Sequence, residues 1–303
     1  MAESIVLAFD LGGTDLKAGR VTRTGEVRGF RRAPSRAGEG PDALMQTVRE
    51  MCDALGGPAG PAIAGFGSPG SIEPRTGTLL GTTPHLALPA DYPLAGRLAE
   101  TLGMRVIVDN DAHCAAIGEH ALGAARGSRV SITVTVGTGV GCGIVIDGRV
   151  FHGAHGAAGE IGHLPLGGSG PTCRCGVPGC LEPWSGGAGL AARARDAGIE
   201  AADARAVFES HHPQAHGLRT RAIEALARQL AAAAAVLDPE VIVIGGGVAR
   251  AGDALLSPLR QAFDAHVPDA LRTRVRIVQA ELGEQSGVTG AGLMAWEALK
   301  APR

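Results

Sequence analysis

Runs of hydrophobic residues alternate along the chain with segments in which apolar side chains recur every three or four positions. Short apolar runs predict buried strands. They lie at residues 5–9, 18–21, 62–66, 106–108, 130–136, 141–146, 241–244 and 276–279. The helical spacing predicts helices at residues 42–55, 93–102, 112–122, 187–197, 220–237 and 290–300. Because strands and helices are mixed, and Asp147-Gly148 indicates a hairpin beside the crossovers, we predict an α/β fold with mixed sheets.

One local pattern occurs twice, near residue 10 and near residue 137. In both places a strand leads into a turn that carries glycine and threonine, and another strand follows. A chain of 303 residues is long enough for two domains of ordinary size. The repetition therefore predicts two domains of related architecture that face one cleft.

Composition narrows the possible classes of function. Hydrophobic residues make up 45% of the chain, which supports a proper core. Aromatic residues make up only 3%, so a surface for stacking bases is not expected. The formal net charge of −2 gives no electrostatic reason to bind nucleic acid or a membrane surface. No apolar run approaches the roughly 20 residues of a membrane span, and the first residues carry no basic leader, so we expect a cytoplasmic protein.

Three closely spaced cysteines suggest a metal site. Cys173, Cys175 and Cys180 are separated by glycines and a proline, which allow a tight knuckle. With a nearby histidine they offer the four ligands of a tetrahedral zinc ion, and reduced cytosolic thiols favour metal over a disulfide. A glycine-rich loop with unpaired thiols and a disulfide are the alternatives. Glu160 and Glu182 flank the knuckle and are not needed as ligands, which suggests that a polar molecule binds here.

Glycine-rich turns provide candidate phosphate sites. The segment from Asp10 to Thr14 places a carboxylate at a strand end before two glycines, whose N–H groups a phosphate can approach closely. The carboxylate can hold Mg²⁺ through water. A second turn spans residues 137–143 and a third spans residues 245–247. The second is neither a Walker motif nor a Rossmann fingerprint, and each turn taken alone can be an ordinary glycine turn.

Asp109, Asn110 and Asp111 lie where a predicted strand meets a predicted helix. Asp111 can cap that helix, or it can be the general base that accepts the proton of an attacking hydroxyl. Asn110 can both donate to and accept from sugar hydroxyls. Phosphoryl transfer needs little beyond positioning, Mg²⁺, phosphate-binding amides and one base. Together these features predict a kinase that acts on a small polyhydroxylated molecule.

The chain resembles the sugar kinases of the repressor, open reading frame, kinase (ROK) family, within the superfamily of hexokinase and actin. The resemblance covers nearly the whole length and implies a two-domain actin-like (ribonuclease H-like) α/β fold with mixed sheets and a cleft between the domains. The resemblance rests on the motifs Asp10-Leu-Gly-Gly-Thr14, Gly65-Phe-Gly-Ser-Pro-Gly70, Asn110-Asp111, Gly137-Thr-Gly-Val-Gly141, Gly159-Glu-Ile-Gly-His163 and Cys173-x-Cys175-Gly-x-x-Gly-Cys180-x-Glu182. The last two of these motifs are together highly specific.

The resemblance also implies a role for each matching residue. Asp111 would be the general base for the 6-hydroxyl of the sugar, and His163 would bind a structural Zn²⁺ through one ring nitrogen and face the sugar with the other. The other zinc ligands would be Cys173, Cys175 and Cys180. The implied sugar-binding residues are Ser68, Pro69, Gly70, His85, Asn110, Asp111, Glu160, His163 and Glu182. The implied residues for ATP and Mg²⁺ are Asp10, Gly12, Gly13, Thr14, Lys17, Gly137, Thr138, Gly139, Gly245, Gly246 and Gly247.

One position departs from the family pattern. Many glucokinases of the family carry Pro-Asn-Leu where this chain has Pro84-His85-Leu86. His85 can replace the hydrogen bonds of that asparagine or shift the preference among sugars. Alternatively, its side chain points away from the pocket and changes nothing.

We therefore predict an ATP-dependent kinase for the 6-hydroxyl of a hexose, with glucose as the expected sugar. N-acetylmannosamine, N-acetylglucosamine, fructose and mannose are alternative substrates, and polyphosphate is an alternative donor. A sugar-responsive transcriptional regulator is a more distant alternative, because the first predicted strand begins at Ile5 and leaves no room for a helix-turn-helix module. The predicted domains are residues 1–117 with a C-terminal helix at about 288–303, and residues 118–287 with the knuckle. The expected ligands are a sugar and a nucleotide, and we expect no binding to nucleic acid or membrane. We expect the protein to assemble as a homodimer or homotetramer.

Overall fold

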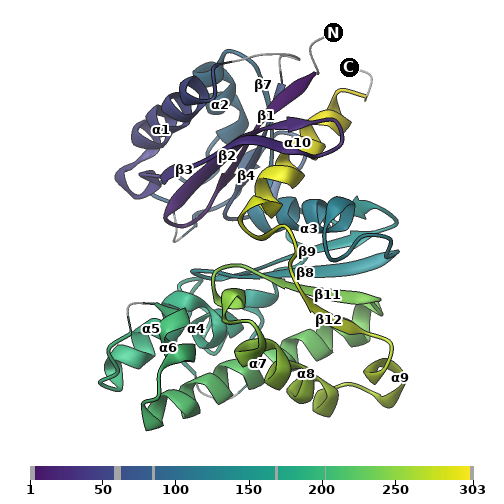
Figure 1. Ribbon diagram of the computed structural model, residues 1–303. Helices are drawn as coiled ribbons and strands as arrows, with labels where there is room; N and C mark the ends of the chain where they lie inside the picture. Colours follow the sequence, from purple (N-terminus) through teal and green to yellow (C-terminus); the bar gives the residue numbers. More distant parts are fainter. Residues whose placement is uncertain (1–3, 58–62, 84–85, 168–169, 202, 301–303) are drawn as a thin grey trace.

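Two five-stranded mixed sheets form the framework of the computed structural model, which describes residues 4–57, 63–83, 86–167, 170–201 and 203–300 (Figure 1). In the first sheet the strand order is β3-β2-β1-β4-β7. Strands β1, β2 and β3 are antiparallel neighbours, whereas β4 and β7 are added in parallel to β1. The strands are β1 (Ile5–Leu11), β2 (Asp15–Thr22), β3 (Val27–Pro34), β4 (Ile63–Ser68) and β7 (Arg105–Asn110).

The second sheet repeats this topology. Its order is β10-β9-β8-β11-β12, with the first three strands antiparallel and the last two added in parallel to β8. The repetition confirms the prediction of two halves with related architecture. The strands are β8 (Val130–Val136), β9 (Val140–Ile146), β10 (Arg149–Val150), β11 (Val241–Gly245) and β12 (Arg276–Gln279).

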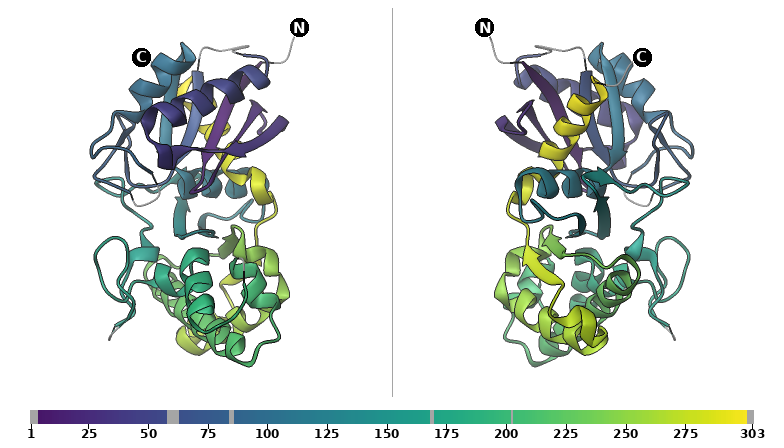
Figure 2. Two further views of the ribbon diagram at one scale, coloured as in Figure 1. Left: turned by 90° about the vertical axis from the view of Figure 1, so that its left-hand side faces the viewer. Right: turned by 90° about the vertical axis from the view of Figure 1, so that its right-hand side faces the viewer.

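Helices cover both faces of the first sheet. Helices α1 (Pro41–Ala54) and α2 (Leu94–Leu102) lie on one face, and α10 (Ser286–Ala298) lies on the other (Figures 1 and 2). Strand β1 contributes side chains to the hydrophobic layers on both faces of the sheet, because successive side chains of a strand point to opposite faces. Phe9 is buried with residues of α1 and α2, whereas Ala8 is buried with residues of α10.

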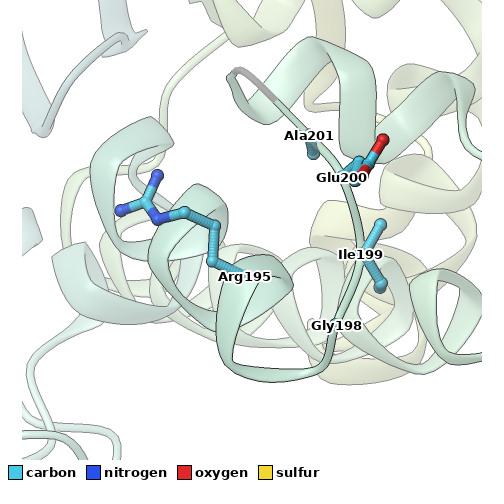
Figure 3. Close-up of a pocket in the computed structure, with 5 residues that line it drawn as sticks. All are labelled: Arg195, Gly198, Ile199, Glu200 and Ala201. Atoms are coloured by element: carbon cyan, nitrogen blue, oxygen red, sulfur yellow. The ribbon is translucent and has the colours of Figure 1, made fainter.

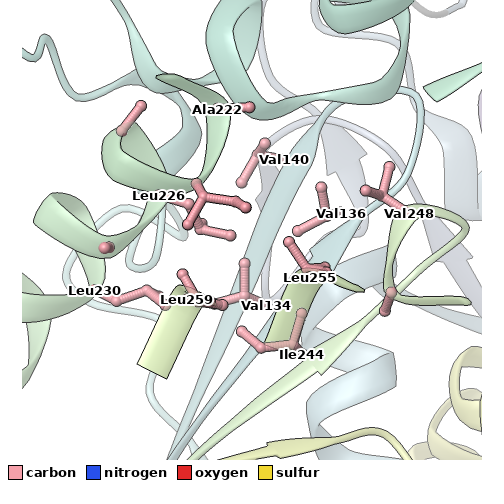
Figure 4. Close-up of a cluster of buried hydrophobic side chains, with 14 of the residues drawn as sticks. Val134, Val136, Val140, Ala222, Leu226, Leu230, Ile244, Val248, Leu255 and Leu259 are labelled. Atoms are coloured by element: carbon pink, nitrogen blue, oxygen red, sulfur yellow. The ribbon is translucent and has the colours of Figure 1, made fainter. Parts of the chain in front are cut away.

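Helix α3 (Asp111–Leu122) lies between the two sheets and packs on the inner face of the second one (Figure 1). The outer face of that sheet is covered by α7 (Pro213–Leu237) and α8 (Asp253–His266), whose leucines interlock with the strands (Figure 4). Shorter elements complete the chain. They are β5 (Ile72–Glu73), β6 (Thr78–Leu79), α4 (Leu181–Ser185), α5 (Gly187–Asp196), α6 (Ala204–Glu209) and α9 (Asp269–Arg272).

The backbones of α3 and α10 cross in direct contact. A side chain at Gly290 would place its Cβ 1.7 Å from the carbonyl oxygen of Cys114, and one at Gly118 would place it 2.4 Å from that of Ser286. Next to the crossing, the fully buried carboxylate of Glu119 accepts hydrogen bonds from the connector that precedes α10. Because α3 contacts both sheets, a domain boundary at residue 117 falls inside a shared helix, and the boundaries 1–117 with 288–303 and 118–287 stay a prediction.

Several predicted bounds require correction. Helix α7 begins at Pro213 and not at residue 220, because His212 accepts a hydrogen bond from the N–H of Gln214 and proline is favourable at the first helical position. Helix α10 begins at Ser286 and not at residue 290, although the first residues are poor helix formers. The sequence patterns did not predict β3, an exposed edge strand that carries three arginines, or α8, which contains Pro258. Among the described residues, none of the helices has the length and apolarity needed to span a bilayer.

Candidate functional site

The predicted acidic residues lie at the carboxyl ends of β1 and β7, on the two sides of β4 in the first sheet. The register pairs Asp10 of β1 with Gly67 of β4, and Gly67 with Asp109 of β7. Because these strands are parallel, their following turns share one edge of the sheet. That edge therefore carries the turn after Asp10, the turn after Ser68 and the junction at Asn110.

The turn after β1 is built around an ion pair. The Lys17 ammonium lies 3.2 Å from Oδ2 of Asp10, its partner across the strand pair, and this charge raises the pKa of Lys17. The N–H of Gly12 closes the turn on the carbonyl of Asp15 at 2.8 Å. Gly287 of α10 packs against Asp10, since a Cβ there would lie 2.4 Å from the carboxyl carbon. Asp10 is thus held rigidly from both sides.

The second predicted glycine turn faces the first across the junction of the two sheets. A Cβ on Gly13 would lie 3.4 Å from the Thr138 hydroxyl, so these two turns are in close contact. The third turn adjoins the second, because Gly246 has φ +85° and a side chain there would meet the carbonyl of Val136 at 2.5 Å. The structure therefore brings together all three turns that were predicted to bind ATP.

Asn110, and not Asp111, is the N-cap of α3. The Asn110 side-chain oxygen accepts from the N–H groups of Ala112 and His113 at 2.9 and 3.2 Å, and its amide donates to the Gly70 carbonyl at 3.0 Å. The alternative interpretation of Asp111 as the cap is therefore wrong. Asp111 is the first residue of the helix, where one carboxylate oxygen accepts from the Ala112 N–H.

The two aspartates beside Asn110 have opposite acidities. Burial raises the pKa of Asp111 to about 7, with a further contribution from the charge of Asp10. Burial also acts to raise the pKa of Asp109, but hydrogen bonds from His113 and His152 overcome it and lower that pKa to about 2. Asp109 is therefore a permanent carboxylate, whereas Asp111 exchanges a proton near neutral pH.

Both flanking carboxylates approach this edge from the second half of the chain. Glu160 accepts a hydrogen bond at 3.4 Å from Ser71, which belongs to the first half. Glu182, at the start of α4, accepts from the N–H of Val140 at 3.0 Å and so lies beside the second glycine turn. In each case the hydrogen bond engages one carboxylate oxygen and leaves the other for a polar ligand.

The knuckle brings its four predicted ligands together. Atoms of His163, Cys173, Cys175 and Cys180 lie within 4.8 Å of one another, with 3.5 Å between Nδ1 of His163 and the sulfur of Cys173, and 3.7 Å between the sulfurs of Cys175 and Cys180. Tetrahedral zinc with ordinary bond lengths requires about 3.6 Å between nitrogen and sulfur and about 3.7 Å between two sulfurs. The residues present therefore fit zinc. Nε2 of His163 points toward Glu160, at 3.9 Å.

The loop after β4 contributes backbone more than side chains. Ser68 is fully buried, and its hydroxyl donates to the carbonyl of Pro69 at 3.1 Å. Gly70, with φ +92°, presents its carbonyl to Asn110. In this conformation the Ser68 hydroxyl is engaged by the backbone of its own loop, so its predicted contact with a sugar stays a prediction. His85 lies outside the described residues.

Four residues of the site were not predicted from the sequence. They are Ser71, His113, His152 and Gly287. Only His113 left a local signal, as a histidine within a helix of small apolar residues. The others matter through contacts with residues far away in the chain, which no spacing rule reveals.

A separate hollow lies in the second half of the chain, where α5 ends (Figure 3). It is lined by Arg195 and by residues 198–201. None of these residues belongs to the predicted site.

Comparison with known proteins gives a consistent result. The profile of the ROK family matches residues 6–298. The chain is 33% identical to a glucokinase of Halalkalibacterium halodurans over 96% of this chain and 95% of the relative, and 36% identical to an N-acetylmannosamine kinase of Citrobacter koseri over 95% and 98%. The crystal structure of a ROK family glucokinase from Streptomyces griseus in complex with glucose and AMPPNP superposes with a TM-score of 0.86 at 27% identity, covering 97% of this chain and all of that one. The likeness confirms the predicted fold.

Proposed function

The chain belongs to the ROK family, and from this premise we propose that it is an ATP-dependent hexose kinase that phosphorylates the 6-hydroxyl of its sugar. The observation that supports this most directly is the position of Asp111. Its carboxyl group has a pKa of about 7 and lies at the sheet edge that also carries the Asp10 turn. A base with such a pKa is suited to accept a proton at physiological pH.

The proposed reaction is a single displacement. The 6-hydroxyl oxygen of the sugar attacks the γ-phosphorus of ATP, its proton passes to Asp111, and the bond from the γ-phosphorus to the bridging oxygen breaks as ADP leaves. The amides of the turns at Gly13, Thr14, Thr138 and Gly139 would hold the phosphates, and Gly245, Gly246 and Gly247 would adjoin the nucleoside. Mg²⁺, held near Asp10, would neutralise phosphate charge when bound.

The proposed sugar site is formed by groups from both halves of the chain. The sugar hydroxyls would donate hydrogen bonds to the carboxylates of Glu160 and Glu182. They would also bind the amide of Asn110, which both donates and accepts, and Nε2 of His163. A zinc ion on Nδ1 of His163 would fix the orientation and the tautomer of the ring, which is a structural and not a catalytic duty. The ligand distances in the knuckle support this division of the two nitrogens.

Glucose is the sugar we propose first, on the strength of the glucokinase relative and the glucose complex. The relative from Citrobacter koseri makes N-acetylmannosamine the second candidate. We further propose that the enzyme is a cytoplasmic homodimer or homotetramer, and light scattering in solution measures that assembly.

The deciding experiment compares kcat/KM for a panel of hexoses and N-acetylhexosamines, each with Mg-ATP and with polyphosphate, using zinc-loaded protein. We expect glucose with ATP to give the highest value. A higher value for N-acetylmannosamine would select the second candidate. Phosphorylation of none of these sugars would refute the proposed function.

A further inference from the structure

Both ring nitrogens of His113 face oxygen atoms that can only accept hydrogen bonds. Nδ1 lies 2.9 Å from Oδ1 of Asp109, and Nε2 lies 3.2 Å from the carbonyl oxygen of Ala158. The Asp109 carboxylate is ionised, with a pKa of about 2, and a backbone carbonyl carries no proton. Each nitrogen must therefore carry a hydrogen, which makes His113 an imidazolium although its side chain is almost fully buried.

Asp109 compensates the charge of this imidazolium. Its Oδ1 also accepts from the N–H of Asn110 at 2.7 Å, and its Oδ2 accepts from Nε2 of His152 at 2.7 Å. The two imidazole rings meet edge to face, with centroids 5.2 Å apart. Burial acts to lower the pKa of His113, but the hydrogen bond and the charge of Asp109 raise it overall.

This network joins two segments that carry opposite sides of the proposed site. Asp109 and His113 flank Asp111, the proposed base. His152 and Ala158 belong to the loop after β10, which continues directly into Glu160. The hydrogen bonds from His113 to Ala158 and from His152 to Asp109 therefore hold the loop of Glu160 against the start of the helix that carries the base.

We propose that the Asp109–His113–His152 network, with His113 as a buried imidazolium, positions the base Asp111 relative to the sugar-binding loop. His113 and His152 are positioning residues, since they act through Asp109 and Ala158 and not on the reacting atoms. The catalytic part of this proposal rests on the proposed kinase activity. The charge state of His113 does not depend on it.

The network has a definite dependence on pH. The ionisable groups that face His113 are Asp109 from β7, Asp111 from α3 itself and His152 from the loop after β10. Because the pKa of His113 is raised by folding, the link to Ala158 is complete below the ordinary histidine value and is lost as the pH rises through the raised value. Activity should consequently decline on the alkaline side when His113 releases its proton.

The test uses the whole chain and four variants. His152→Ala removes the donor to Asp109, whereas His152→Gln keeps an N–H at a similar distance. His113→Gln keeps the approximate size and cannot become a cation. His155→Ala is the matched control, because His155 is an exposed histidine in the same loop.

We expect His152→Ala to lower kcat about tenfold or more and to raise the hexose KM, because both sides of the site shift, while the ATP KM is unchanged. His152→Gln should recover most of the loss, and His155→Ala should match the wild type. His113→Gln should remove the alkaline decline of the kcat profile. Loss of folded protein alone would lower the apparent kcat without moving either KM or the profile, and that result would overturn the positioning role.

A measurement without turnover separates this proposal from the kinase assignment. Nitrogen NMR of histidine-labelled protein at neutral pH should show both ring nitrogens of His113 protonated, with the assignment made from His113→Gln. A neutral ring would refute the imidazolium, whatever the activity. Binding of an additional metal equivalent that disappears in His152→Ala would also refute it, because the metal would take the imidazole lone pairs. If the wild type phosphorylates no sugar but His113 is an imidazolium, only the kinase assignment and its catalytic consequence fail.

Discussion

The charge of Asp10 raises the pKa of Asp111 beyond the larger increase that burial causes, and the result is a carboxyl group with a pKa of about 7. Lys17 opposes this effect, since it pairs with Asp10 and lowers the pKa of Asp111. The two aspartates therefore divide their duties. Asp10 is paired with Lys17 at the first glycine turn, and Asp111 can take up and release a proton.

Replacing Asp111 tests its assignment as the base. Asp111→Asn should lower kcat by about two to four orders of magnitude, which is the usual contribution of general acid–base catalysis, and should leave sugar affinity largely intact. Calorimetric sugar binding and a coupled kinase assay measure the two effects. Asp147→Asn is the matched control, because Asp147 is an exposed turn residue with φ +49°, a conformation that asparagine also tolerates. A near-normal kcat in Asp111→Asn would contradict the assignment.

The pH profile of kcat should show a decline on the acidic side that is centred near pH 7. Asp111 accepts a proton only when it is ionised, so activity is present above its pKa of about 7 and is lost as the pH falls through that value. The measurement uses saturating sugar and Mg-ATP with coupling enzymes in excess at each pH. A kcat that is constant on both sides of pH 7 would argue against Asp111 as the titrating base.

Removing one cysteine should affect both metal content and sugar affinity. Cys175→Ser should lose zinc, and the sugar KM should rise about tenfold as His163 loses its fixed orientation. Elemental analysis and steady-state kinetics report these changes. Cys52→Ser is the control, because Cys52 is buried in α1 and contributes nothing to the knuckle. Equal zinc content in Cys175→Ser and the wild type would exclude the proposed metal site.

Two glycine substitutions should change stability in opposite directions. Gly290→Ala places a methyl group against the carbonyl of Cys114 at the helix crossing, so we expect a loss of about 1–3 kcal/mol in the free energy of unfolding. Gly96→Ala lies within α2, has open space around the new Cβ, and should gain about 0.5–1 kcal/mol. Thermal unfolding of both variants compares them directly. A Gly290→Ala protein as stable as the wild type would mean that the helices separate at no cost.

Features encoded by neighbouring residues could be predicted well. The cysteine knuckle is an example, because Cys173 to Cys180 form one tight turn whose glycines and proline leave few arrangements. Most strands were also found, since their apolar runs reflect burial within a sheet. Strand β3 was missed because it is an exposed edge strand, where charged side chains carry no signal of burial.

Contacts between distant segments could not be predicted in the same way. His152 reaches Asp109 across 43 positions of the chain, and Gly287 touches Asp10 from the opposite end of the sequence. These contacts depend on the register of the sheets and on how closely α10 approaches β1. Packing sets both, and a single local pattern contains no information about either.

The four hydrogen bonds accepted by Glu119 have a consequence for how the molecule opens. Its carboxylate joins the end of α3 to the connector before α10, through the N–H groups of Ala124, Glu281 and Leu282 and the hydroxyl of Ser286. Releasing the connector would leave this buried carboxyl group with the N–H of Ala124 as the remaining donor among these four, which is costly. The connector amides should therefore exchange with solvent deuterium as slowly as those of the sheets, and the two halves should unfold as one cooperative unit.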